Sequence, residues 1–518
     1  MRYFHMPALS PVTFEEFAVE AARGGVVPVV RTRLADLHTP VSMFLQIAAG
    51  EPHAFLLESI EGGEHVGRYS FVGAKPKMIV RGVGEKTFVE QDGRTVTHGM
   101  NAVAYLRQWF SEHKLVEREG LPPLAGGAIG YMGYEAARWF EPVLAKSFAE
   151  QAASAPDTNG ANAENDALFL FCDTIVAHDH VRQQLTITTL AHVGDDKDDA
   201  RLHDIYTRAV AETERVDRLL DHPLTVSRSA KKSAGAEAIV ECNWSQAGYE
   251  NGVRKIQEHI LAGDCYQAVL SLRFSRSVQA EPLEIYRALR TTNPSPYMFL
   301  MQLGEEALVG SSPEMLVRCR GRALDYRPIA GTRKRGKSAE EDRALAHELL
   351  ADEKENAEHM MLVDLGRNDL GRVAEYGTVH VDQLRFIERY SHVMHMVTAL
   401  SARLREGLDS FDALASCFPA GTVSGEPKIR AMEILAGIEP TPRGVYAGSI
   451  LYVDYAGNLD SCIAIRTMRM HGNGNAKTAE VQAGAGIVAD SVPANEYEEC
   501  MNKAKTLLAA IARAEEGL

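Results

Sequence analysis

Residues 482–503 read QAGAGIVADSVPANEYEECMNK, and this stretch is the strongest sequence signal for both the fold and the site. Its segment Gly484-Ala485-Gly486 is expected to form a turn whose backbone N–H groups can face an anion. A helix is predicted to follow over Asn495–Ala514, with Glu499 and Lys503 four residues apart on one face. Taken alone, that spacing indicates only a surface ion pair. Its meaning depends on segments far upstream.

Three consecutive strand-like runs, of which the last enters this stretch, are joined by short, turn-like links. The links are too short for a parallel crossover, so the strands are expected to pair antiparallel. Helical periodicity interleaves with these strands, and the predicted fold class is α+β, with antiparallel β-sheets packed against flanking helices. The strands are predicted at Val445–Val453, Leu459–Met470 and Thr478–Val488, and the further helices at Ser245–Ala262, Ala339–Leu365 and Pro427–Ala436.

The N-terminal part also combines strands and helices. Strand-like runs at Ala54–Ile60 and Leu168–Ile175 precede an amphipathic helix at Arg201–Leu219. Two stretches rich in small and polar residues, Ala149–Asn165 and Asp221–Ala238, are expected to be loops. The predicted organisation is an N-terminal domain at 1–220, a linker at 221–240 and a C-terminal domain at 241–518.

Charge and cysteine content narrow the class of protein. The 518 residues carry a formal net charge of −15, which argues against binding to nucleic acids or to anionic membranes. The seven cysteines are scattered without metal-site spacing, which favours a reducing, cytoplasmic location. The N-terminus has no signal-peptide pattern, and no run reaches the ~18 apolar residues typical of a membrane helix.

One motif suggests a different function, that of a nucleotide hydrolase. Residues 331–338 (GTRKRGKS) match the phosphate-binding P-loop pattern, and Met360–Asp364 resembles its magnesium-binding strand. A P-loop needs a strand before it and a partly buried helix after it, whereas Pro328 interrupts the run here. Residues 339–365 contain neither Gly nor Pro and predict one long helix, so Asp364 is not expected to end a buried strand. We therefore reject a P-loop.

Within that predicted helix, one carboxylate is expected to point inward. Glu358 precedes Met361, Leu362 and Leu365 at helical spacing, which places it on an apolar stripe. A buried carboxylate needs a cation, and an internal ion pair with a basic side chain is the simplest way to supply it. If Glu499 also points inward, two carboxylates with few other ligands match the preference of Mg²⁺, which keeps several waters for a substrate.

An anionic substrate of such a site needs cations from the strands. Alternation along Leu459–Met470 is expected to place Arg466 on one face with Cys462, where its guanidinium can bind a carboxylate. Tyr446 on a neighbouring strand can add a hydroxyl donor. His395 alternates with valines, and a histidine in that position is more often a core residue than a catalytic one.

Taken together, these segments resemble the chorismate-utilising enzymes, which include anthranilate, aminodeoxychorismate, isochorismate and salicylate synthases. The resemblance is carried by ordered motifs over about 240 residues, which makes it specific although each motif alone is weak. The motifs are Gly263–Gln267, Ser311–Glu314, Pro328–Thr332, Asp352–Gly371 (DEKENAEHMMLVDLGRNDLG), His392–Met396, Phe418–Lys428 (FPAGTVSGEPK), Leu459–Thr467 and Val481–Lys503.

The resemblance implies roles for these residues. Glu358 and Glu499 resemble the ligands of Mg²⁺, the implied cofactor, and Glu314 resembles the acid that protonates the departing 4-hydroxyl of chorismate. His395 and Thr422 resemble the pair beside the substrate ring, with His395 implied in a later elimination of pyruvate. The other implied chorismate contacts are Gly331, Thr332, Tyr446, Arg466, Gly484, Ala485, Gly486 and Lys503.

Two positions indicate which reaction of the family is catalysed. Isochorismate and salicylate synthases carry a lysine where this chain has Gln267, because water needs a base to attack the ring and ammonia does not. Aminodeoxychorismate synthases typically carry a nucleophilic lysine at the position of Ala330. The resemblance therefore implies amination of chorismate at C2 and loss of pyruvate to give anthranilate, the first committed step of tryptophan biosynthesis. Aminodeoxychorismate and isochorismate synthases stay the alternatives.

Upstream motifs resemble the tryptophan feedback site of anthranilate synthases, although taken alone they predict only a strand end and a turn. The residues implied are Glu58, Ser59, Asn293, Pro294, Pro296, Tyr297, Met298 and Cys462. Glutamine hydrolysis needs a nucleophilic cysteine in a strand-to-helix elbow, and no such motif is present. The expected partner is a separate glutamine amidotransferase subunit that supplies ammonia, in a heterotetramer of two large and two small subunits.

Overall fold

The computed structural model describes residues 9–59, 67–155, 165–195, 198–224, 239–390, 393–472 and 477–517. These residues form two large β-sheets, and every pair of neighbouring strands within them is antiparallel. The predicted α+β fold class is confirmed. No helix among the described residues is long and apolar enough to cross a membrane.

The first sheet has 13 strands and joins the N-terminal and C-terminal parts of the chain through the pairing of β3 with β14. In spatial order its strands are β1 (Leu9–Ser10), β2 (Gly25–Leu34), β11 (Gln184–Gly194), β10 (Thr174–Asp179), β4 (Tyr69–Ala74), β3 (His53–Glu58), β14 (Tyr297–Leu303), β15 (Glu306–Ser312), β24 (Thr467–His471), β25 (Lys477–Ile487), β13 (Gln267–Val278) and β12 (Glu241–Cys242), with β21 (Gly425–Glu426) also paired to β13.

The second sheet has 12 strands and joins the two parts through the pairing of β22 with β8. Its order is β18 (Ile329–Lys334), β20 (Val393–Arg403), β17 (Ala323–Tyr326), β16 (Met315–Arg320), β23 (Leu459–Ile463), β22 (Ser449–Asp454), β8 (Gly127–Met132), β9 (Ala167–Cys172), β5 (Met78–Val83), β6 (Lys86–Gln91) and β7 (Arg94–His98), with β19 (His380–Arg389) also paired to β20.

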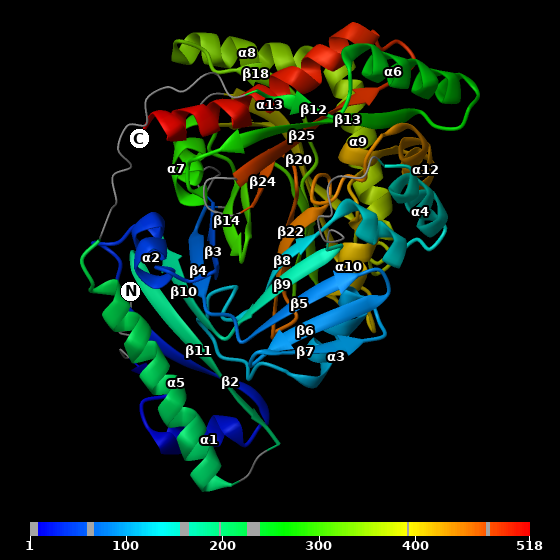
Figure 1. The fold of residues 1–518 in the computed structure, drawn as a ribbon. Helices are drawn as coiled ribbons and strands as arrows, with labels where there is room; N and C mark the ends of the chain where they lie inside the picture. Colours follow the sequence, from blue (N-terminus) through cyan, green and yellow to red (C-terminus); the bar gives the residue numbers. More distant parts are fainter. Residues whose placement is uncertain are drawn as a thin grey trace.

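Helices cover the outer faces of both sheets, and the inner faces pack on each other. Phe55 and Phe299 of the first sheet share a buried cluster with Ile129 and Leu170 of the second. In Figure 1, α13 and α6 lie across β25 and β13, and α5 lies along β2 and β11. The helices are α1 (Phe14–Ala21), α2 (Pro40–Ile47), α3 (Ala102–Glu112), α4 (Leu144–Ser154), α5 (Asp199–Leu220), α6 (Gln246–Leu261), α7 (Pro282–Thr292), α8 (Ala339–Ala351), α9 (Glu353–Gly371), α10 (Ser410–Cys417), α11 (Gly421–Ser424), α12 (Lys428–Ile438) and α13 (Pro493–Glu516), with a 3₁₀ helix at Tyr134–Trp139.

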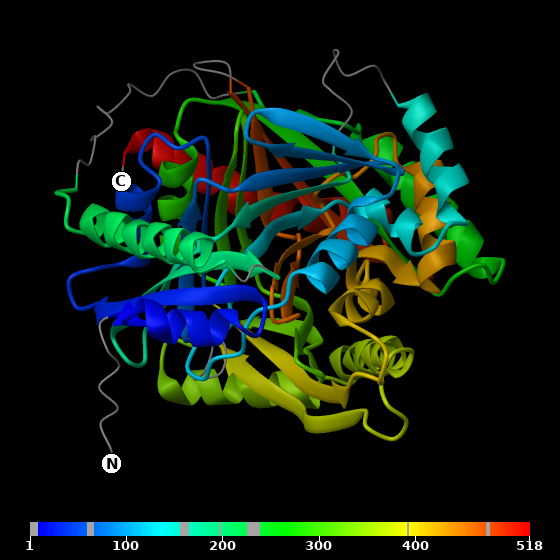
Figure 2. The same ribbon diagram turned by 90° about the horizontal axis from the view of Figure 1, so that it is seen from below.

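The long helix predicted at Ala339–Leu365 is wrong in one respect, because it is two helices. Asp352 separates α8 from α9 with an extended backbone, and its carboxylate accepts hydrogen bonds from the N–H groups of Lys354 and Glu355, both at 3.1 Å. Asp364 does lie within a helix, as expected. Figure 2 shows α8 and α9 beside the yellow hairpin of β19 and β20.

Two other expectations also change. The single strand predicted at Leu459–Met470 is interrupted, since β23 belongs to the second sheet and β24 to the first. The loop predicted at Ala149–Asn165 begins inside α4, and its residues 156–164 lie outside the described residues. Most of the predicted linker at 221–240 also lies outside them, so the division into domains stays a prediction.

Candidate active site

The segment Gly484-Ala485-Gly486 lies inside β25, so the predicted turn is wrong. Gly486 is the register partner of Val269 and Gly484 that of Ser271 on β13, which leaves their backbone groups in the sheet ladder. The glycines instead make room: a Cβ atom on Gly486 would lie 2.4 Å from Gln267 Nε2, and one on Gly484 would lie 2.7 Å from Tyr446 Oη. Ala485 points to the opposite face and is buried under the helices.

Arg466 lies where the chain crosses from one sheet to the other. Its φ is +50°, so the predicted alternation with Cys462 does not hold. Burial lowers the pKa of its guanidinium, and the nearby Tyr446 opposes that change. Within the described part of the chain the guanidinium has no hydrogen bond or ion pair, although a buried cation needs a counter-charge. An anionic ligand can supply that charge.

Glu314 follows β15 and is 9% exposed. Burial raises the pKa of its carboxyl from 4.5 to about 7, and the nearby Thr422 and Lys503 oppose the rise without cancelling it. The Thr422 hydroxyl on α11 is buried and has no partner within hydrogen-bond geometry among the described residues. A carboxylic acid that keeps its proton near neutral pH can act as a general acid.

Acidic side chains of α9 and α13 form the next part of the site. Glu358 is exposed, which contradicts the prediction that it points into the core, because the buried stripe of α9 runs one residue further along, through His359 and Val363. The surrounding protein nevertheless shields the Glu358 carboxyl in part from water, which raises its pKa, and the neighbouring carboxylates of Glu355 and Glu499 raise the pKa further. The two predicted metal ligands therefore lie close enough to repel each other.

Lys503 joins these carboxylates to the sheet. Its ammonium donates to the carbonyl of Gly484 at 2.8 Å and pairs with Glu499 at 2.7 Å, as the helical spacing predicted. Burial raises the pKa of Glu496 as well, and the negative charge of Glu499 adds to that rise. Three carboxylates thus share one lysine at this end of α13, with Lys354 of α9 also acting on Glu496.

His395 faces Thr332 across the pairing of β20 with β18. Its Nδ1 lies 3.0 Å from Thr332 Oγ1 and 3.1 Å from the carbonyl of Gly331, at a bulge where Gly331 has a φ of +66°. Burial lowers the pKa of His395, and the positive charge of Arg466 contributes to the decrease. This lowered pKa favours the neutral imidazole, which can accept a proton.

These contacts link most of the predicted active-site residues, whereas Ala485 faces the helices. The charge of Arg466 acts on His395, and Tyr446 acts on Arg466. The Tyr446 hydroxyl in turn lies against Gly484. Gly484 binds Lys503, whose charge acts in turn on Glu314 and Glu358. The sequence prediction did not include the buried residues that hold these active-site residues in place.

That support is a buried ion pair. Arg443 and Glu439 are 2% and 6% exposed and lie 2.8 Å apart. Arg443 also donates to the carbonyls of Val423, next to Thr422, at 2.7 Å and of Val269 on β13 at 2.5 Å. It thereby ties α11 to the strand that begins with Gln267. The only sequence signal was an Arg and a Glu four residues apart, which usually lie on a surface.

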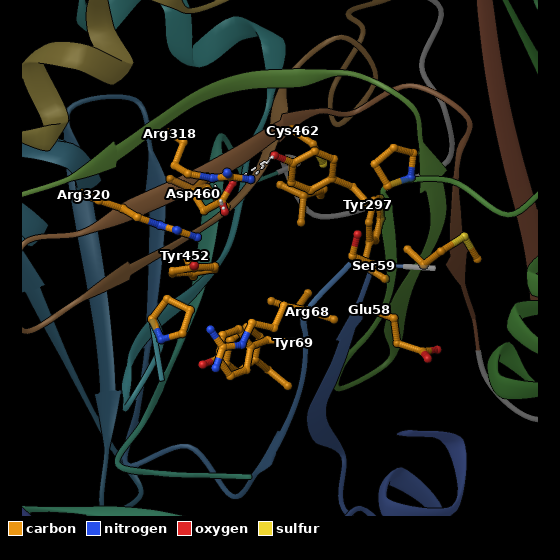
Figure 3. A pocket seen from close by; sticks show the side chains of 18 residues that line it. Glu58, Ser59, Arg68, Tyr69, Tyr297, Arg318, Arg320, Tyr452, Asp460 and Cys462 are labelled. Atoms are coloured by element: carbon orange, nitrogen blue, oxygen red, sulfur yellow. Dashed lines mark hydrogen bonds and ion pairs between the residues drawn. The ribbon is translucent and has the colours of Figure 1, made fainter. Parts of the chain in front are cut away.

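A separate cavity of about 240 Å³ lies between the two sheets (Figure 3). Six of the eight residues predicted for the feedback site line it, and Asn293 and Pro294 do not. Ser59 Oγ is buried without a partner among the described residues, whereas Glu58 is held by Tyr286 and by Arg290 at 3.1 Å. The lining residues from the predicted set are Glu58, Ser59, Pro296, Tyr297, Met298 and Cys462.

The opposite wall of this cavity was not predicted. Asp460 accepts hydrogen bonds from Tyr297 at 3.0 Å and from Arg318 at 2.8 Å, and Tyr452 and Arg320 add to the polar lining of this wall. Arg318 and Asp460 come from adjacent strands that are far apart in the sequence, so no local pattern could join them. Asn293 instead binds Ser311, beside the strand that leads to Glu314.

The chain belongs to the chorismate binding enzymes, whose family model matches residues 52–509. Anthranilate synthase component 1 of Acetivibrio thermocellus is 43% identical over 512 residues, which cover 97% of this chain and 99% of the relative. The Pseudomonas putida protein of the same name is 41% identical, with 97% and 99% covered. The crystal structure of anthranilate synthase component I from Streptococcus pneumoniae matches with a TM-score of 0.69 at 33% identity and covers 86% of this chain and 95% of its own.

A menaquinone-specific isochorismate synthase from Escherichia coli has the same fold. Its TM-score is 0.65 at 19% identity, with 96% of this chain and 98% of the other covered. Members of one fold thus carry out different reactions, and the reaction of this chain has to be argued from its site.

Proposed function

We propose that this chain aminates chorismate at C2 with ammonia and then eliminates pyruvate to give anthranilate, as the large subunit of an anthranilate synthase. The observation that favours amination over hydration is the neutral amide of Gln267, which lies against Gly486 within the site. A side chain there that takes no proton suits ammonia, which needs no activation, better than water.

In the first step, the substrate carboxylates bind Arg466 and Lys503, and the hydroxyl of Tyr446 donates a further hydrogen bond. Ammonia attacks C2 with its lone pair, the ring double bonds shift, and the bond from C4 to the hydroxyl oxygen breaks. Glu314 donates its proton to that oxygen, so that water leaves, and the ammonium group formed at C2 releases a proton to solvent to give the amine. The raised pKa of Glu314 keeps this proton available near neutral pH.

In the second step, a base takes the proton at C2, the bond from C3 to the enolpyruvyl oxygen breaks, and the departing enolate gains a proton on its methylene carbon to become pyruvate. His395 contacts Thr332 at 3.0 Å and lies close enough to Arg466 to feel its charge, and its lowered pKa favours the neutral imidazole. We assign it this proton transfer. The aromatic ring of anthranilate results.

Magnesium fits the carboxylates of Glu358 and Glu499. These two carboxylates lie close enough to raise the pKa of Glu358, and a cation between them would relieve that repulsion, with water and substrate completing its coordination. When bound, Mg²⁺ would neutralise the repelling carboxylates and attract the substrate carboxylate. Lys503 pairs with Glu499 at 2.7 Å and so fixes the position of that carboxylate.

The cavity of Figure 3 is proposed as the tryptophan feedback site, with the unpartnered hydroxyl of Ser59 as one contact. We further propose that a glutamine amidotransferase subunit supplies ammonia, in a heterotetramer of two large and two small subunits. The seven cysteines are all unpaired, which supports a reducing, cytoplasmic location.

A change at Gln267 tests which nucleophile the site selects. Gln267→Lys places a base beside the ring, so water should compete with ammonia and isochorismate should appear beside anthranilate. An unchanged product spectrum would show that Gln267 does not select the nucleophile. Ala330→Lys is the matched test for aminodeoxychorismate chemistry, since Ala330 is buried beside Gly331.

A further inference from the structure

Glu426 lies beside Gln267 at the end of the first sheet. The two residues are register partners in the pairing of β21 with β13, and the carbonyl of Glu426 accepts a hydrogen bond from the N–H of Tyr266 at 2.7 Å. Register partners in an antiparallel pair project from the same face of the sheet. Because the Gln267 amide faces Gly486 of the proposed chorismate site, the Glu426 side chain projects to that side as well.

One oxygen of this carboxylate, Oε2, is buried and has no hydrogen-bond partner among the described residues. No Lys, Arg or His of the described chain lies within ion-pair distance of it. The charged groups that act on it are Asp369 and Lys428, which pair with each other at 3.1 Å. Burial is the main cause of the raised pKa of Glu426. A buried acceptor without a donor is unfavourable unless a ligand supplies the donor.

The chemistry of the reactants identifies that ligand. Chorismate is a dianion and is repelled by a carboxylate. Ammonia offers three N–H donors, and a hydrogen bond from one of them leaves its lone pair free. The position next to Gln267 is also where the proposed reaction needs its nucleophile.

We propose that Glu426 is the binding residue for ammonia and holds it beside Gln267 through an N–H donated to Oε2. This inference rests on the proposed amination of chorismate and deepens it. A mere structural role for Glu426 at the start of α12, where a negative charge favours the helix N-terminus, is the competing explanation.

The test uses the full-length chain with Mg²⁺ and ammonium chloride at a fixed pH. Steady-state anthranilate formation is measured for wild type, Glu426→Gln and Glu426→Ala, first with ammonium varied and then with chorismate varied. The matched control is Glu433→Gln on α12, because Glu433 pairs with the partly exposed Arg430 at 3.1 Å.

The KM for ammonium should rise about tenfold in Glu426→Ala, because one charge-assisted hydrogen bond is lost. The KM for chorismate should stay within about twofold of wild type. Glu433→Gln should match wild type. If Glu426→Ala does not fold, the nearly isosteric Glu426→Gln carries the test.

An unchanged KM for ammonium in a folded variant, or an equal rise in the KM for chorismate, would overturn the assignment and support the structural role. Failure of the proposed function is a different result, because the wild-type chain itself would then make no anthranilate at any ammonium concentration.

Discussion

Replacing Glu314 by Gln should make the protein more stable at alkaline pH. The carboxyl titrates near 4.5 in the unfolded chain and at about 7 in the folded protein, because it is buried. As the pH rises through this window the unfolded chain gives up the proton first, so the folded state loses stability. At about 1.4 kcal/mol per pH unit, the difference between these pKa values amounts to about 3 kcal/mol above pH 7.

Gln resembles the protonated acid and does not titrate. The variant should therefore match wild type near pH 4.5 and exceed it by up to about 3 kcal/mol at pH 8, as measured by urea unfolding at both pH values. The same variant should lose a factor of about 10² to 10⁴ in kcat, because the general acid is gone. A stability difference that is independent of pH, or a kcat close to wild type, would refute this account of Glu314.

Three further changes test other parts of the site. Arg466→Met removes an unpartnered buried cation, so the KM for chorismate should rise about 10- to 100-fold with little loss of stability on heating; a strongly destabilised protein would indicate an ion pair instead. Arg443→Met leaves Glu439 buried without its partner and should destabilise the fold by about 3 to 5 kcal/mol in urea, whereas a neutral result would deny the pair its supporting role. Ser59→Phe places a ring in the cavity of Figure 3 and should relieve inhibition by added tryptophan while the uninhibited rate stays constant; inhibition at the wild-type concentration would move the regulatory site elsewhere.

Much of the fold could be predicted because its signals are local. The periodicity at Ser245–Ala262 gave α6, that at Arg201–Leu219 gave α5, and the short links gave antiparallel pairing. The break at Arg466 was not visible, since a strand that changes sheets keeps its apolar pattern on both sides. The break at Asp352 was visible only as a capping residue in a helical run.

The candidate site residues were predicted from motifs, whereas their geometry could not be predicted. Glycines in Gly484-Ala485-Gly486 indicated a turn, yet they serve as gaps in a strand for Tyr446 and Gln267, which the sequence cannot show because those partners are distant. The predicted apolar stripe that contained Glu358 was displaced by one residue from the buried stripe of α9, which is enough to move a side chain from the core to solvent. The roles of Arg443, Glu426 and Asp460 depend on their burial and on their contact partners. A local sequence pattern predicts neither the burial nor the partners.

The central claim is that this chain transfers a nitrogen from ammonia to chorismate and releases pyruvate. The direct test incubates the purified chain with chorismate, Mg²⁺ and ¹⁵N-labelled ammonium and identifies the products by mass spectrometry. The account predicts anthranilate with one ¹⁵N atom and one pyruvate for each, and no product when EDTA is added. Isochorismate, or a labelled aminodeoxychorismate that keeps its enolpyruvyl group, would contradict it.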